Sequence, residues 1–260
     1  MSKHTGYGIR RTVDETLVVG IDPVTDHTWR LSMRRSVAID EDWPPELARD
    51  LGRAAGRCAW LVPEEDVTCT QTPMPRLKRG EMVRAVTGWV ARQEGGAPED
   101  WAVSWRAFST TTGKADSQQV AMVYADREDL EGHVNAAASL GVVPSLMLPA
   151  SLIVDQFFRA AAPESASLDV WNLVYVGGRT NVLCVANRDG LLLTRPLPGD
   201  LTGGADRQEY LERLTTEVDR SIFFARQTAG SPQVDGVFVC GDPVLSEELV
   251  ASLRESTTVT

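Results

Sequence analysis

The sequence has few of the residues that usually bind metals or form covalent cross-links. It contains four cysteines and three histidines in 260 residues, and no two cysteines form a CxxC pair. No histidine has metal-ligand spacing to another histidine or to a cysteine. The sequence therefore gives no support to a zinc-binding or disulfide-stapled fold. Most of the cysteines lie in apolar runs, and we expect them to be small buried side chains in a reducing compartment.

Common catalytic motifs are also absent. The chain has no P-loop, no GxGxxG, no GxSxG nucleophile elbow and no HExxH, so a hydrolase or metalloenzyme of these classes is not indicated. The acidic pair Glu64-Glu65 lies in a predicted loop, and Glu247-Glu248 lies at a predicted helix start. We expect both pairs to be solvated, because a general acid and base need burial to separate their pKa values.

The sequence has no long apolar span of the kind that crosses a membrane. The longest stretch without a charge runs over 21 residues, from Val134 to Val154, but it contains two prolines and a glycine. It is typical of a helix end, a turn, a strand and a helix start. The first 16 residues are polar and do not resemble a signal peptide. We expect a soluble chain.

Basic residues are outnumbered, and unevenly so. Lys and Arg total 26 against 36 Asp and Glu, which gives a net charge of −10 and argues against binding to nucleic acid or anionic lipid. Residues 1–125 hold 16 basic and 17 acidic groups, whereas residues 126–260 hold 10 and 19. The two halves therefore differ in surface chemistry.

The second half predicts the element order β-β-β-α-β-α. Gly177-Gly178-Arg179 and Asn187–Gly190 have the composition of tight turns between strands. Asp242 is placed as an N-cap, with Pro243 at the first helical position. The predicted strands are Val170–Val176, Thr180–Ala186, Leu191–Leu197 and Val234–Cys240, and the predicted helices run from about Asp206 to Thr228 and onward from Asp242.

The first half repeats this order around an insertion. Its predicted elements are strands Leu17–Ile21, Thr28–Met33 and Ser36–Ile39, helix Pro45–Ala55, strand Cys58–Val62, helix Arg127–Leu140, strand Pro144–Leu148 and a helix from Ala150. The insertion reads β-α-β-β, with a helix from about Leu77 to Gln93 that buries Met82, Val86, Trp89 and Val90 on one side. Two such units with an α/β insert predict a duplicated fold with a cleft between its halves.

Short stretches in a specific order resemble a known family. They are Val19-Gly20-Ile21-Asp22, Thr72-Pro73-Met74-Pro75, Leu140–Pro144, Val174–Thr180, Asp189-Gly190 with Leu193-Thr194-Arg195, Glu217–Phe224, and Val239-Cys240-Gly241-Asp242. In this order they resemble the actin-like PilM and GspL proteins of type IV pilus and type II secretion machinery. The resemblance is dispersed over nearly the whole chain and leaves open which of the two subtypes is meant.

The resemblance implies an actin-like (ribonuclease H-like) α/β fold with duplicated βββαβα lobes. The first lobe would cover residues 1–168 and carry the inserted βαββ subdomain at about 66–125. The second would cover residues 169–260 and lack the family's second insert, which is reduced here to Gly199–Glu209. The chain stops at Thr257–Thr260, in what would be the last strand, so we expect it to be the cytoplasmic portion of a longer protein.

The resemblance also implies a nucleotide cleft, in vestigial form. Its candidate residues are Asp22, Thr25, Gly177, Gly178, Thr180 and Gly241. The first loop continues Pro23-Val24-Thr25 without the glycine that permits close approach of a phosphate, and Tyr175 stands where the family's second loop has an acidic residue. We expect no catalytic residue, no metal site, no efficient ATP hydrolysis and no cofactor, with ATP and Mg²⁺ as the less favoured alternative.

The implied function is a non-enzymatic scaffold at the cytoplasmic side of the bacterial inner membrane. Its partners would be a bitopic membrane protein, bound as a PilN-like extended peptide or replaced by the chain's own membrane segment, and the motor ATPase. The exposed basic residues Arg76, Lys78, Arg79 and Arg84 are candidates for the motor contact. A homodimer is compatible with the resemblance. The alternatives are a nucleotide-binding actin-like ATPase or kinase relative, and an unrelated α/β interaction module.

Overall fold

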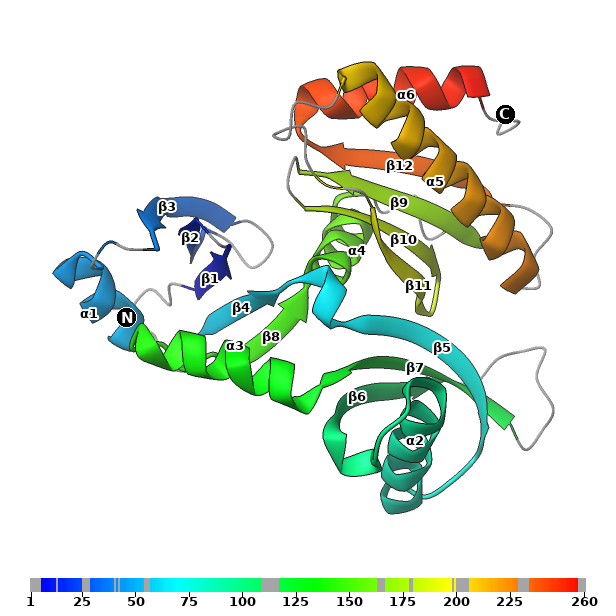
Figure 1. Ribbon diagram of the computed structural model, residues 1–260, viewed down its shortest axis with the longest axis horizontal. Helices are drawn as coiled ribbons and strands as arrows, with labels where there is room; N and C mark the ends of the chain where they lie inside the picture. Colours follow the sequence, from blue (N-terminus) through cyan, green and yellow to red (C-terminus); the bar gives the residue numbers. More distant parts are fainter. Residues whose placement is uncertain are drawn as a thin grey trace. The chain divides into compact units, whose positions relative to one another are not determined.

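The chain forms two compact units, each an α/β arrangement built on one sheet (Figure 1). The computed structural model describes residues 6–12, 14–24, 29–39, 41, 43–53, 57–108, 117–162, 167–177, 180–197, 199, 206–228 and 234–256. Unit 1 comprises Met1–Asp66 and Asp126–Ala150, and unit 2 comprises Val67–Ala125 and Ser151–Thr260. The inserted segment therefore shares a compact unit with the C-terminal half, and the boundary between actin-like lobes at residues 168 and 169 stays a prediction.

Unit 1 contains a five-stranded sheet in the order β3-β2-β1-β4-β8. Its elements are β1 (Gly6–Arg11), β2 (Glu15–Pro23), β3 (Trp29–Ala38), α1 (Pro45–Arg53), β4 (Cys58–Val62), the 3-10 turn η1 (Glu64–Asp66), α3 (Arg127–Ser139) and β8 (Leu146–Pro149). The first three strands are antiparallel, and β4 pairs parallel with both β1 and β8.

The strand positions predicted for the start of unit 1 were wrong in two ways. The chain begins its sheet at β1, which the sequence did not predict because Ile9 is its only buried hydrophobic residue; pairing with β2 and β4 on either side makes it a strand. The ranges predicted as two separate strands, 28–33 and 36–39, fall on one described strand, β3, because Arg34 and Arg35 between them pair with Val19 and Val18 of β2 in unbroken register.

Glu64 also corrects a prediction, because only 2% of it is exposed where we expected a solvated side chain. It follows buried Val62 after a single proline, so the end of β4 carries it into the interior. At the other end of η1, the Asp66 carboxylate lies 2.8 Å from the Nε2 atom of His133 on α3.

Helix α3 begins as predicted. The Asp126 carboxylate accepts a hydrogen bond from the Glu128 amide at 2.7 Å and so caps the helix.

Unit 2 contains a seven-stranded sheet in the order β12-β9-β10-β11-β5-β7-β6. Its elements are β5 (Thr68–Pro75), α2 (Arg79–Glu94), the 3-10 turn η2 (Pro98–Asp100), β6 (Trp101–Phe108), β7 (Ser117–Asp126), α4 (Ala150–Ala161), β9 (Val170–Val176), β10 (Asn181–Asn187), β11 (Gly190–Leu197), α5 (Arg207–Thr228), β12 (Gly236–Gly241) and α6 (Pro243–Ser256). The predicted β-α-β-β insert and β-β-β-α-β-α order are both present.

Strand β9 is buried on both faces, and this organises the C-terminal part of unit 2. Val174 and Val176 on one face belong to the core shared with Leu214 and Val218 of α5 and with α6. On the other face Trp171 packs against Phe158 of α4, with ring centroids 6.1 Å apart. A strand covered by helices on both sides is expected to be almost continuously apolar, as Val170–Val176 is.

The insert has a core of its own. Met82, Val86 and Val90 of α2 are buried against Val120 and Met122 of β7, which confirms the predicted inward face of this helix. At its edge, the ring of Trp101 meets that of Tyr124 edge-on at 5.9 Å. The Tyr124 hydroxyl donates to Glu94 at 2.5 Å, and burial together with this bond raises the pKa of Tyr124.

The insert joins the rest of the unit 2 sheet through β5 and β11. The join consists of the backbone pair Leu193 and Thr70 and a hydrogen bond of 2.7 Å from the Gln71 side-chain amide to the Leu191 carbonyl. By contrast, β5 pairs with β7 over all eight of its residues. One sheet therefore runs through the insert and the C-terminal half, with a narrow junction between them.

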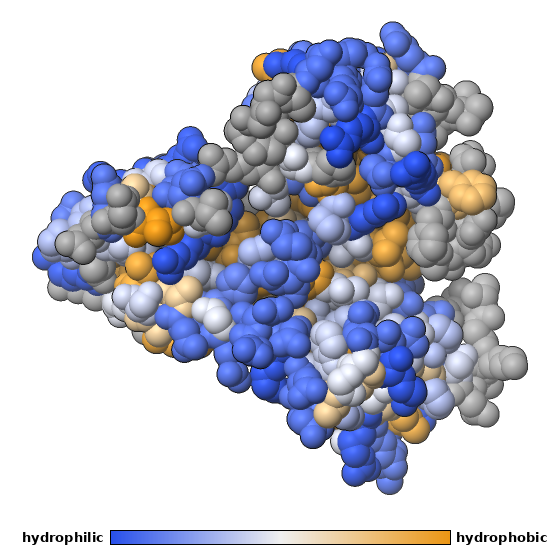
Figure 2. Space-filling model, viewed as in Figure 1, coloured by the Kyte–Doolittle hydropathy of each residue, from blue (hydrophilic) through white to orange (hydrophobic). Residues whose placement is uncertain are grey.

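The described part of the chain contains no helix long and apolar enough to cross a membrane. Hydrophilic residues cover most of the face shown in Figure 2, and hydrophobic residues appear there in separate patches. Scattered exposed apolar residues are normal on folded proteins, whereas continuous ones suggest a contact.

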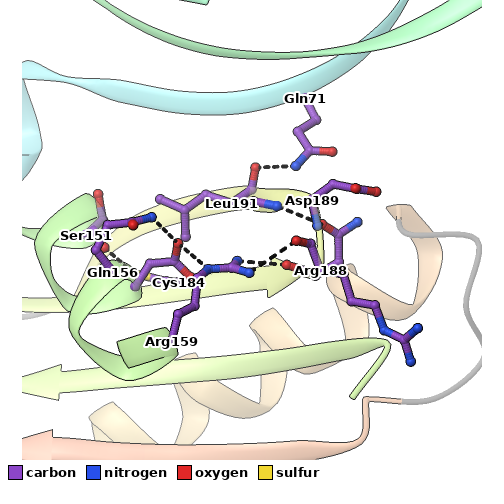
Figure 3. A network of polar contacts seen from close by, with 11 residues as sticks. Gln71, Ser151, Gln156, Arg159, Cys184, Arg188, Asp189 and Leu191 are labelled. Atoms are coloured by element: carbon purple, nitrogen blue, oxygen red, sulfur yellow. Dashed lines mark hydrogen bonds and ion pairs between the residues drawn. The ribbon is translucent and has the colours of Figure 1, made fainter. Parts of the chain in front are cut away.

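A polar network fastens α4 to the hairpin between β10 and β11 (Figure 3). The Arg159 guanidinium donates to the Asp155 carboxylate at 2.9 Å and to the carbonyls of Asn187 and Arg188 at 2.7 and 3.3 Å. It also lies over the Trp171 ring, 4.9 Å from the centroid. Because Asp155 is only 1% exposed, Arg159 balances a charge that would otherwise be buried alone.

Two buried asparagines on adjacent strands give opposite predictions for stability. Neither polar atom of the Asn172 side chain has a partner among the described residues, although the residue is fully buried. The Asn181 amide donates to the Tyr210 hydroxyl at 2.5 Å. We therefore expect Asn172→Val to raise, and Asn181→Val to lower, the free energy of unfolding by about 1–3 kcal/mol each. Denaturant titration of both variants beside the wild type measures this, and a destabilised Asn172→Val protein would contradict the prediction.

Candidate functional site

The turn after β9, predicted as a vestigial phosphate loop, uses its backbone donor internally. The Gly177 amide donates to the Asn181 side-chain oxygen at 2.9 Å and to the Thr180 carbonyl at 3.1 Å. A loop that binds phosphate must leave its amides free to point at the anion. Gly177 and Thr180 therefore lie together in this turn, and the Gly177 amide is already hydrogen-bonded within the protein.

The side chain of Tyr175 lies directly against Gly177. A Cβ atom added to this glycine would come within 2.6 Å of a Tyr175 ring carbon and 2.7 Å of the Tyr175 hydroxyl oxygen. The same Cβ atom would also lie 2.9 Å from the Thr180 backbone carbonyl oxygen, so both the Tyr175 ring and the backbone of the turn disfavour a side chain at this position. The position that would need a carboxylate to orient metal-bound water carries a phenol, which is not a ligand that Mg²⁺ prefers.

Gly241, the third predicted element of the cleft, is also explained by packing. Its φ is +121°, and a Cβ atom there would lie 2.1 Å from the Val176 carbonyl oxygen. The next amide, of Asp242, donates to that carbonyl at 2.7 Å, and the Asp242 carboxylate accepts the Val244 and Leu245 amides at 3.0 Å each. The predicted N-cap of α6 is therefore confirmed, and Gly241 lies opposite Val176, the residue before Gly177.

In unit 1, Asp22 is engaged by a neighbouring strand. It lies opposite Arg30 in the pairing of β2 with β3, and the guanidinium is 3.9 Å from its carboxylate. Burial raises the pKa of Tyr7, and the carboxylates of Asp50 and Asp22 raise it further. The Asp22 carboxylate therefore interacts electrostatically with the Arg30 guanidinium and the Tyr7 phenol, both in unit 1.

Two predicted cleft residues are not described, and the described residues include no group of metal ligands. Thr25 and Gly178 lie outside the described residues. Among the residues that are described, no three His, Cys, Asp or Glu side chains are grouped so as to hold a metal ion. Cys58, Cys69 and Cys184 are buried as predicted, Cys240 is partly buried, and burial raises the pKa of the Cys58 and Cys240 thiols. A raised pKa disfavours the reactive thiolate.

Sequence reasoning missed two residues that define the site, Arg30 and Asn181. Asn181 directly follows the predicted turn, and an asparagine at a turn often accepts a nearby backbone amide; that signal was present but was not used. Arg30 is different, because its pairing with Asp22 depends on the register of β2 and β3 after a bulge. No local pattern reveals that register.

Comparison of the whole chain with solved structures decides the fold. A chain of the PilM-PilN type IV pilus biogenesis complex superposes with a TM-score of 0.67 at 17% sequence identity, over 96% of this chain and 86% of that one. The fold is the actin-like fold. The resemblance to PilM that the sequence motifs predicted is thereby confirmed at the level of structure.

Two further structures are similar over most of their length. One is a Bacteroides thetaiotaomicron protein with an actin-like ATPase fold and unknown function (TM-score 0.49, 13% identity, 98% of this chain and 88% of that one). The other is the cytoplasmic domain of EpsL, an inner membrane component of the type II secretion system of Vibrio cholerae (TM-score 0.49, 10% identity, 98% and 97%). No protein-family model and no curated protein sequence matches the chain.

The glycines of this actin-like chain can be tested as structural residues. We expect Gly241→Ala to destabilise the protein by at least about 3 kcal/mol, because it combines a left-handed backbone with overlap of the Val176 carbonyl. The control is Gly132→Ala on the exposed side of α3, where an added Cβ meets nothing within 4 Å; this change should stabilise by about 0.5–1 kcal/mol. Thermal unfolding of both variants measures the difference, and equal melting temperatures would contradict it.

Proposed function

We propose that this chain is a cytoplasmic actin-like scaffold of the inner-membrane assembly platform of a type IV pilus or type II secretion system. It would link membrane components to the motor ATPase and reside at, or tethered to, the bacterial inner membrane. The observation that carries the proposal is the superposition on the PilM-PilN complex over 96% of the chain. The ordered sequence motifs support the same assignment independently.

The geometry of the glycine turns supports a scaffold rather than an ATPase. An actin-like ATPase needs free loop amides for the phosphates and acidic side chains for the metal. Here the Gly177 amide is bonded to Asn181 and Thr180, and Tyr175 replaces the acidic residue. Asp22 keeps the carboxylate of the first loop but lies beside Arg30. These features favour an actin-like protein that keeps the glycine turns but does not bind or hydrolyse ATP.

Nucleotide binding is the second candidate, favoured by the retained Asp22 alone. A ligand that binds only the folded state at a hundred times its dissociation constant adds about 2.7 kcal/mol of stability, or several degrees of melting temperature. We expect millimolar ATP with Mg²⁺ to leave the melting temperature of the wild-type protein unchanged. A shift that disappears in Asp22→Ala would instead support a nucleotide-binding protein.

The proposed contact with the motor ATPase involves the start of α2. Arg79 and Arg84 on this helix and Lys78 before it are exposed, and Leu77 and Val83 beside them are 38% and 45% exposed. Basic groups around exposed apolar side chains fit a partner with an acidic, partly apolar surface. The net negative charge of the whole chain makes this local basic surface distinct.

Charge reversal tests this contact. We expect the double variant Lys78→Glu and Arg79→Glu to lose capture of the purified motor ATPase, because like charges then face each other. The matched control is Arg34→Glu with Arg35→Glu, two exposed arginines on β3. Pull-down with both variants, together with their melting temperatures, gives the result. Undiminished capture by the Lys78 and Arg79 variant would remove α2 from the proposed interface.

A further inference from the structure

The strand pattern at the start of unit 1 repeats that of the C-terminal half of unit 2. In unit 1, β1 pairs antiparallel with β2 and parallel with β4, and β2 pairs in turn with β3. In unit 2, β9 pairs antiparallel with β10 and parallel with β12, and β10 pairs in turn with β11. Strand β1 therefore corresponds to β9, and the two faces of each strand can be compared.

The two faces of the unit 1 sheet differ in burial. On one face, the register partners Ile9 of β1, Val18 of β2 and Trp60 of β4 are at most 2% exposed. On the other face, which we call the open face, none of the described residues is buried. The larger apolar residues of the open face are Leu17, Val19, Ile21, Leu31, Leu61, Leu146 and Leu148.

Three of these apolar side chains are largely exposed. Ile21 of β2 and Leu31 of β3 lie directly opposite each other and are 39% and 58% exposed. Leu146 of β8, at the other edge of the sheet, is 51% exposed. All three belong to one alternating apolar pattern that crosses the sheet, and a contiguous exposed apolar surface marks a place of contact.

The middle of the open face is formed by small residues. Gly8 of β1 lies in one row between Val19 of β2 and Ala59 of β4. A Cβ atom added to Gly8 would meet only Val19, at 3.9 Å, so the described packing does not require a glycine there. A glycine inside a strand often marks a place where another backbone approaches closely. The open face has room for an element that lies close against β1.

The helices α1 and α5 show which faces correspond. Helix α5 follows β11 and packs on the face of β9 that carries Val174. Helix α1 follows β3, and burial together with the α1 carboxylate of Asp50 raises the pKa of Tyr7, which shares the buried face with Ile9. The open face of unit 1 therefore corresponds to the face of β9 that carries Trp171.

In unit 2 this corresponding face is covered by a helix. Trp171 and Leu173 of β9 are each only 1% exposed, and Phe158 of α4 packs against Trp171. Two turns earlier on α4, the Ser151 carbonyl accepts a hydrogen bond from the Cys184 thiol of β10 at 3.8 Å. Helix α4 thus covers β9 and β10 on the side whose counterpart in unit 1 is open.

Charge selects the kind of helix that fits. On the open face Arg10 is paired with Glu15 at 3.7 Å, which leaves the exposed Arg34, opposite Val19, as the unbalanced charge. An acidic side chain beside an apolar stripe would complement Arg34. Two copies of a chain with a net charge of −10 repel each other, which disfavours a second copy as the occupant.

We propose that the open face of unit 1 binds an amphipathic helix of a partner protein. Its apolar stripe lies over Gly8 between Ile21 and Leu146, in the way that α4 lies over β9, and an acidic side chain at its border meets Arg34. The site is separate from the basic start of α2. It does not depend on the assignment to pilus or secretion machinery, since it rests on the burial pattern of the sheet and on the repeat within the chain.

Three synthetic peptides test the site. The probe is a fluorescent peptide, EALQELLAQLQALLQE, whose leucines form one helical stripe. A second peptide has lysine at each glutamate position, and a third has proline in place of the central alanine, which breaks the helix but keeps every leucine. We expect the acidic helix to bind at least about tenfold more tightly than either control by fluorescence anisotropy.

Variants of the protein locate the site. We expect Gly8→Val to weaken binding of the acidic peptide at least about tenfold without lowering the melting temperature, because valine suits a strand but fills the space over β1. Leu31→Asp should weaken binding to a similar extent. The matched control is Phe223→Asp on α5, where the side chain is 63% exposed, and it should leave binding unchanged.

Four outcomes would overturn the proposal. They are equal binding of the helical and proline-containing peptides, no binding of the acidic peptide at about 1 mM, and undiminished binding by Gly8→Val. The fourth is a melting temperature that Leu31→Asp lowers by about 5 °C or more, which would mean that the chain itself already covers this face. A wild-type dimer that Gly8→Val converts to monomer in sedimentation would likewise replace the partner helix by a second copy.

Discussion

The backbone of Val176, the last residue of β9, is the point on which the C-terminal half of unit 2 depends. Its carbonyl accepts the amide of Asp242, which fixes where the parallel strand β12 ends and where α6 begins. Because Gly241 passes so close to this carbonyl, only a residue without a side chain fits there. One hydrogen bond thus links the end of β9 to the end of β12 and the start of α6.

The same close packing bears on how the two glycines are to be interpreted. A side chain at Gly177 would approach the Tyr175 ring and the Thr180 carbonyl, and one at Gly241 would overlap the Val176 carbonyl, so packing favours both glycines whether or not a phosphate binds. Glycines at hairpins are therefore weak indicators of a nucleotide site. The occupied amide of Gly177 and the phenol at Tyr175 are better indicators, because they bear on the chemistry itself.

Local patterns predicted the elements whose determinants lie in their own sequence. The caps of α3 and α6, the inward face of α2 and the two turns of the β9–β11 meander follow from residues such as Asp126, Asp242 and Gly190. Strand β1 was not predictable in this way, because its buried content is a single isoleucine and its neighbours in the sheet decide its structure.

For the candidate site, the sequence identified the positions but not their partners. Tyr175 and Gly177 are two residues apart, yet this spacing alone does not predict that the Tyr175 ring lies against Gly177. The pairing of Asp22 with Arg30 depends on register, and the burial of Glu64 depends on the direction of β4. Each of these outcomes follows from tertiary packing rather than from local propensity.

The junction between β5 and β11 has a mechanical consequence. Load applied to the insert along its strands is carried within the insert by an eight-residue ladder, but it reaches the rest of the sheet through one backbone pair and the Gln71 side chain. Because fewer hydrogen bonds cross the junction than cross the ladder between β5 and β7, we expect the junction to separate first under tension along the strands. The two parts of the unit 2 sheet would then move apart while each part keeps its own strand pairing.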